Sequence, residues 1–153
     1  MLRHFARRVG TILEVEMALH RAYAAEWGIS GAELEAERMA PETRAYADFL
    51  LRTAALGSFP EAAAALLPCV WGYVELGRSL AAGPRPADER CARWIDAYAS
   101  DALAELCDSF REVVDGLAAE ADAATRKRMR EAFLASSRHE LSLWDLAWRG
   151  PDG

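Results

Sequence analysis

Apolar residues recur along the chain at intervals of three and four, the spacing of one face of an α-helix. This pattern predicts a first helix over Leu2–Trp27, and the following Gly28 can adopt a left-handed cap. A second helix is expected over Pro41–Leu56, with proline at a tolerated first position. A third is expected from Ser58 to about Ala82, kinked where Pro68 removes a backbone hydrogen bond.

The second half of the chain continues the helical pattern. A loop is expected at residues 83–86, Gly-Pro-Arg-Pro, followed by a helix over residues 88–98. Ser100 can cap a further helix to about Ala121, and a last helix is expected over Ala123–Arg149. A short helix or turn is also expected at residues 30–33, where serine and glutamate have capping-box spacing. The prediction is an all-α single domain over 1–153, with five or six long antiparallel helices around one core.

Composition narrows the possible functions. The net charge is -6 and no basic stripe is present, which argues against a nucleic-acid partner. The longest apolar runs, such as residues 62–70, are too short to span a bilayer, and the N-terminus lacks the pattern of a signal peptide. The three cysteines, Cys69, Cys91 and Cys107, form no CxxC pair and fit reduced thiols. We therefore expect a cytoplasmic protein without a membrane partner.

Cys69 and Tyr73 are one helical turn apart and so share a helix face. Pro68 precedes the thiol, and we expect it to loosen the backbone carbonyls there. A single helical cysteine is usually a small core residue, and only a partner that stabilises its thiolate makes it a nucleophile. Tyr46 and Tyr98, taken alone, are typical of core aromatic residues whose hydroxyl groups are satisfied.

Glu140 lies on a largely apolar helix face. Burial would raise the pKa of its carboxyl group toward the range useful for proton transfer. The alternative is that Glu140 points outward or pairs with Arg138 or Arg149. Glu16 and His20 also share a helix face, as metal ligands in helical bundles do, but a second Glu-x-x-His motif is missing and no metal site is predicted.

Taken together, four stretches resemble the TenA family, the thiaminase II group of the TenA/PqqC superfamily. They read EMALHRAYAAEWGIS, TRAYADFLLRTA, LLPCVWGYVELG followed by WIDAYAS, and SSRHELSLWDLAW. The segment Leu-Pro-Cys-x-Trp-x-Tyr is the most specific part. The resemblance implies a heme-oxygenase-like (TenA-like) helical bundle, commonly a homotetramer.

The resemblance also implies an activity and a site. The activity is hydrolysis of thiamin or of its aminopyrimidine breakdown product in thiamin salvage, with no cofactor. Cys69 matches the family's nucleophile and Glu140 its acid/base. Tyr46, Tyr73 and Tyr98 match the tyrosines that line the pyrimidine pocket.

The sequence departs from the family at three places. Family members carry further N-terminal helices, which supply an aspartate that binds the aminopyrimidine, so the chain is expected to be a fragment or a natural short form that pairs with copies of itself. His139 stands where a tyrosine is common, and Leu143 where an aromatic residue often flanks the substrate. Two other functions therefore stay open: a non-catalytic pyrimidine-binding or regulatory protein, and a PqqC-like oxidase.

Overall fold

The computed structural model describes residues 17–150, and this part of the chain is built from helices with no strand. The helices are α2 (Met17–Glu26), α3 (Gly31–Ala36), α4 (Pro41–Leu56), α5 (Phe59–Leu66), α6 (Pro68–Ala81), α7 (Glu89–Tyr98), α8 (Asp101–Glu120) and α9 (Ala123–Arg149). The all-α prediction is thus confirmed over the described part. Residues 2–16 of the predicted first helix lie outside it.

The chain divides into two compact units, residues 1–39 and residues 40–153. In the first unit, α2 ends before Gly28, whose positive φ of 78° is the left-handed conformation predicted there. Ser30 then caps α3, and the side chain of Glu33 bonds back to the backbone of Ser30 in a complete capping box.

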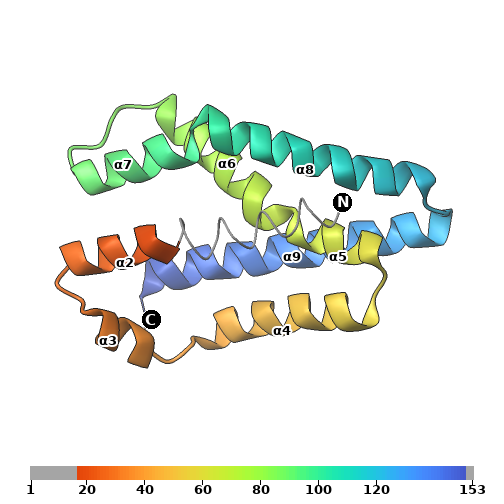
Figure 1. The fold of residues 1–153 in the computed structure, drawn as a ribbon, viewed down its shortest axis with the longest axis horizontal. Coiled ribbons are helices and arrows are strands. Elements are labelled where there is room, and N and C mark those ends of the chain that lie inside the picture. Colours follow the sequence, from red (N-terminus) through yellow and green to blue (C-terminus); the bar gives the residue numbers. More distant parts are fainter. Residues whose placement is uncertain (1–16, 151–153) are drawn as a thin grey trace. The chain divides into compact units, whose positions relative to one another are not determined.

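The second unit contains α4 to α9. Helix α9 is its longest element, and α4, α5 and α6 all pack against it (Figure 1). Ala63, Ala64 and Ala65 on α5 are almost fully buried, and side chains this small let α5 lie close to α9. Helix α6 packs on α7 and α8, and Val74, Ala104 and Cys107 form a core cluster there.

Pro68 does more than the predicted kink. Residues 59–81 form two helices, α5 and α6, because α5 ends at Leu66 and Pro68 opens α6 at its first position. Proline tolerates that position, where its missing N–H has no helical partner in any case. The backbone amides of Val70 and Trp71 both bond to the carbonyl of Leu67, which starts the new helix.

The other predicted boundaries fall close to those of the structure. Ser100 caps α8 and Asp122 caps α9, each accepting a bond from a backbone amide in the first turn. Helix α9 ends at Gly150, which has a positive φ of 77°. No helix in the part of the chain that the structure describes is long and apolar enough to cross a membrane.

Candidate functional site

A cavity of ≈ 730 Å³ opens between α6 and α9, a size typical of small-molecule sites. Its walls are mainly apolar and aromatic, with two carboxylates, Glu75 and Glu140, among them. The lining residues are Pro68, Trp71, Gly72, Tyr73, Glu75, Leu76 and Leu80 from α6, and Phe133, Ser137, Glu140, Leu141 and Trp144 from α9. All of them belong to the second compact unit.

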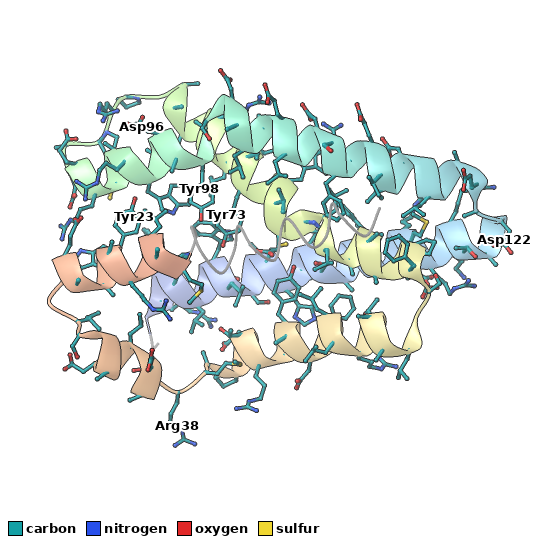
Figure 2. The ribbon with its side chains drawn as sticks, viewed as in Figure 1. Tyr23, Arg38, Tyr73, Asp96, Tyr98 and Asp122 are labelled. Atoms are coloured by element: carbon teal, nitrogen blue, oxygen red, sulfur yellow. The ribbon has the colours of Figure 1, made fainter. Side chains whose placement is uncertain are left out.

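Four aromatic rings meet beside this cavity. Tyr73 of α6 contacts Tyr98 of α7 at 5.1 Å and Trp144 of α9 at 5.5 Å between ring centroids. Trp94 lies within 6.3 Å of all three of these rings. Figure 2 shows Tyr73 and Tyr98 close together, projecting from their two helices. Such a cluster offers flat apolar faces, which suit a flat heteroaromatic ring.

Trp71 forms another part of the wall and is fixed from two sides. Its indole N–H donates to Glu75 Oε1 at 2.9 Å, and the guanidinium group of Arg111 lies 4.5 Å from the ring centroid. Cation–π and hydrogen-bond contacts of this kind hold a ring in one orientation. The wall of the cavity formed by α6 is therefore preorganised.

Cys69 lies at the helix break. It is partly buried, and its Sγ donates to the carbonyl of Leu66 at 2.9 Å. In an unbroken helix that carbonyl would accept the amide of Val70, which here bonds to Leu67 instead. The predicted loosening of the carbonyls beside the thiol is thus confirmed, and it gives Cys69 a defined side-chain orientation.

Glu140 is half-buried, one turn before Trp144 on α9. Burial raises the pKa of its carboxyl group, and a side-chain hydrogen bond from Tyr46 partly opposes the rise. Arg149, one of the partners considered for Glu140 from the sequence, instead forms an ion pair with Glu42 at 3.9 Å. The raised pKa makes this carboxyl group a better proton donor than an exposed glutamate.

Tyr46 of α4 interacts electrostatically with both Cys69 and Glu140. Its side chain is buried, and burial raises the pKa of its hydroxyl well above the ordinary value, so Tyr46 stays protonated. Electrostatic interactions with Cys69 and Glu140 also raise the pKa of this hydroxyl. Tyr46, Cys69 and Glu140 thus lie close together although they come from three helices.

His139 has a defined place in this group. Its ring stacks on Tyr46 at 5.3 Å with an interplanar angle of 10°, and Phe49 lies 5.2 Å away on α4. A flat side chain at position 139 therefore supports the ring of Tyr46. This contact gives a physical reason why histidine can stand where the resemblance suggested a tyrosine.

The structure brings the five predicted site residues into two neighbouring groups. Tyr73 and Tyr98 belong to the aromatic cluster, while Tyr46, Cys69 and Glu140 form a polar cluster. Tyr73 and Glu140 also line the cavity. Sequence reasoning gave no role to Trp94, Trp144, Glu75 or Ser136. Helical spacing could have indicated two of them, because Ser136 and Trp144 each lie one turn from Glu140 and so share its helix face.

The pair Glu16 and His20, which shares a predicted helix face, lies partly outside the described residues. His20 lies on α2, whereas Glu16 is not described. Within residues 17–150, no group of three or more histidine, cysteine, aspartate or glutamate side chains is placed to hold a metal ion.

The described residues thus form an all-α bundle with an aromatic cavity, a cysteine at a helix start and a half-buried glutamate. The chain belongs to the TENA/THI-4/PQQC family, whose model matches residues 1–150.

Curated relatives have a function in their names. An aminopyrimidine aminohydrolase of Halalkalibacterium halodurans is 39% identical, over 94% of this chain and 65% of the relative. Another of Bacillus subtilis is 35% identical, over 89% of this chain and 57% of the relative. The chain thus spans somewhat less than two thirds of the length of these relatives.

A solved structure confirms the fold. A protein described as a TenA family transcription regulator from Silicibacter sp. TM1040 superposes with a TM-score of 0.83 at 28% identity. The match covers 94% of this chain and 65% of that chain. The predicted TenA-like helical bundle is therefore confirmed.

Proposed function

We propose that this chain carries the catalytic residues of an aminopyrimidine aminohydrolase of the thiaminase II type, acting in thiamin salvage. The observation that carries the proposal is the cluster of Cys69, Tyr46 and Glu140 beside an aromatic cavity. The names of the curated relatives support the same class of reaction.

The proposed chemistry begins at a ring nitrogen. An aminopyrimidine is a poor electrophile until that nitrogen is protonated, and Glu140 is the proposed proton donor because its raised pKa favours the acid form. The Cys69 thiolate then adds to a ring carbon. This addition expels the protonated amine from the CH2 group attached to the ring as ammonia, or the thiazole from the same CH2 group of thiamin, and leaves an exocyclic methylene. Water adds to this methylene and gives a proton back to the Glu140 carboxylate. Expulsion of Cys69 restores the thiol and releases the hydroxypyrimidine.

The aromatic residues are proposed to bind the ring. Tyr73 and Tyr98 supply flat faces and hydroxyl groups, with Trp144 closing the side of the cavity formed by α9. Tyr46 supplies a hydroxyl that stays protonated and bonds to Glu140. In this proposal the site uses no metal or organic cofactor, and the partner is a small molecule. A cytoplasmic location and a homo-oligomeric assembly also stay proposals.

The proposal is tested by incubating the 153-residue chain with 4-amino-5-aminomethyl-2-methylpyrimidine, and separately with thiamin, and separating the products by chromatography. Hydroxypyrimidine formed in an amount equal to ammonia from the aminopyrimidine, or equal to the thiazole from thiamin, supports the hydrolase. Calorimetry with the hydroxypyrimidine runs alongside. Heat of binding without product formation would instead indicate a pyrimidine-binding protein, and the absence of both would reject the proposed ligand class.

A further inference from the structure

Ser136 is a fully buried polar side chain, with 0% of its surface exposed. It lies on α9 one turn before Glu140, and its Oγ is 2.7 Å from the hydroxyl oxygen of Tyr46 on α4. A serine inside a helix commonly donates to the backbone carbonyl one turn earlier. Ser137 and Ser142 of α9 do so, to Phe133 at 2.9 Å and to Arg138 at 3.0 Å.

The direction of the Ser136–Tyr46 bond follows from counting hydrogens. Each hydroxyl has one hydrogen to donate and lone pairs to accept with. Among the described residues, Tyr46 is the hydrogen-bond partner of Ser136, whereas Tyr46 also interacts with Glu140. If Ser136 donates to Tyr46, the Tyr46 hydroxyl can donate its own hydrogen to Glu140, and both donors are satisfied. The reverse direction would leave the Ser136 hydrogen buried without an acceptor, which is costly.

We propose that Ser136 is a positioning residue, whose hydroxyl donates to Tyr46 and thereby directs the Tyr46 hydroxyl to donate to the Glu140 carboxylate. The bond itself stands on the geometry, and its catalytic consequence rests on the function proposed above. Ser136 acts through Tyr46 and does not touch the substrate.

The proposed bond changes the pKa of the Glu140 carboxyl group. Titratable groups around it are Tyr46 from α4 and Cys69, Tyr73 and Glu75 from α6, while His139 of α9 packs on the Tyr46 ring. The bond from Tyr46 stabilises the ionised carboxylate and so holds its pKa below the value that burial alone would give. Without Ser136 the Tyr46 hydroxyl can rotate, this bond weakens, and the pKa of Glu140 rises further.

The test titrates Glu140 by NMR of glutamate carboxyl carbons, with the Glu140→Gln variant used to assign the signal. Ser136→Ala is expected to move the titration midpoint to higher pH, and Tyr46→Phe to move it at least as far. Adding Ser136→Ala to Tyr46→Phe is expected to cause no further shift. Ser142→Ala is the matched control, because the Ser142 hydroxyl bonds to the backbone carbonyl of Arg138 in the same helix. It is expected to leave the midpoint unchanged.

Two further measurements make the result decisive. Ser136→Cys keeps a weak donor of similar size, so its midpoint should lie between wild type and Ser136→Ala, and it replaces the alanine variant if that fails to fold. If the wild-type chain turns over aminopyrimidine, Ser136→Ala should lower kcat by about tenfold with little change in KM, as loss of orientation does. An unshifted midpoint in Ser136→Ala, or an equal shift with and without Tyr46, would overturn the proposal. Absence of turnover in the wild-type chain would reject the proposed function, and the titration would still decide the role of Ser136.

Discussion

Gly77 of α6 lies directly against the backbone of Tyr98 at the end of α7. A Cβ atom on Gly77 would stand 2.6 Å from the carbonyl carbon of Tyr98 and 2.8 Å from its oxygen, distances that real Cβ atoms do not adopt. This close approach of the two helices places Tyr98 beside Tyr73, which lies one turn before Gly77. The aromatic cluster therefore depends on a residue that has no side chain.

Gly77→Ala is expected to push α6 and α7 apart and to destabilise the protein by about 1–3 kcal/mol, as overpacking does. Gly116→Ala is the matched control, because Gly116 lies in α8 with nothing within 4 Å of its added methyl group. That control should gain up to about 1 kcal/mol from helix propensity. Urea denaturation of both variants measures the difference, and equal stability of the two would contradict the packing argument.

Tyr73 is the ring that joins the cluster to the cavity. Replacing it with leucine removes the aromatic face, and we expect pyrimidine affinity to fall by roughly two- to twelvefold, the range for one aromatic pair. Tyr73→Phe keeps the face and should bind nearly as well as wild type. Calorimetry with the hydroxypyrimidine measures both, and a larger loss in the phenylalanine variant would show that the hydroxyl group carries the binding instead.

Glu140 is expected to cost stability at neutral pH. Since its pKa is raised in the folded state, the folded protein holds a proton that the unfolded chain has already released. Its stabilising contribution is full below the ordinary glutamate pKa and is lost as pH rises through the raised value. Glu140→Gln should therefore melt at a higher temperature than wild type at pH 7 and at nearly the same temperature at pH 4. A variant that melts lower at pH 7 would show that contacts in the folded protein stabilise the ionised carboxylate.

The same group sets an expected pH dependence of activity. As a general acid, Glu140 must be protonated, so kcat/KM should fall as pH rises through its raised pKa. Glu140→Gln should lose most activity at every pH and should lack this alkaline limb. Stopped assays between pH 5 and pH 9, a range set by the known tuning of catalytic carboxylates, measure the profile. An unchanged limb in the variant would assign it to another group.

Helix α9 also carries exposed apolar side chains at helical spacing. They are Leu134, Leu141, Trp144 and Trp148. Leu141 and Trp144 also line the cavity, whereas Trp148 lies outside it and is 91% exposed. Exposed apolar patches favour association. We expect the chain to sediment as a species larger than a monomer, and Trp148→Glu to shift it toward the monomer. A wild-type chain that sediments as a single monomer would contradict this expectation.

Local signals predicted the helix boundaries well, because caps, glycines and prolines act within a few residues. Helix α4 has the predicted bounds, and Ser100 caps α8 as expected. The predicted interruption at Pro68 is confirmed, and it divides the segment over residues 58–82 into α5 and α6. The described residues also contain two short helices, α3 and α5, besides the longer ones.

The candidate site was predictable only in part. The resemblance selected Cys69, Glu140 and three tyrosines, and helical spacing aligned Ser136, Glu140 and Trp144 on one face. The bond between Tyr46 and Ser136 joins residues 90 positions apart. No local pattern reveals which helices lie opposite each other, so this contact needed the three-dimensional arrangement.

The central claim is that Cys69 is the nucleophile of an aminopyrimidine hydrolase. The most direct measurement compares kcat/KM for aminopyrimidine hydrolysis in wild type, Cys69→Ser and Cys91→Ser, where Cys91 is an exposed thiol on α7 and serves as the control. We predict that Cys91→Ser keeps wild-type activity while Cys69→Ser falls by at least about a thousandfold, as loss of a catalytic nucleophile does. A Cys69→Ser variant that retains activity comparable to wild type would contradict the account.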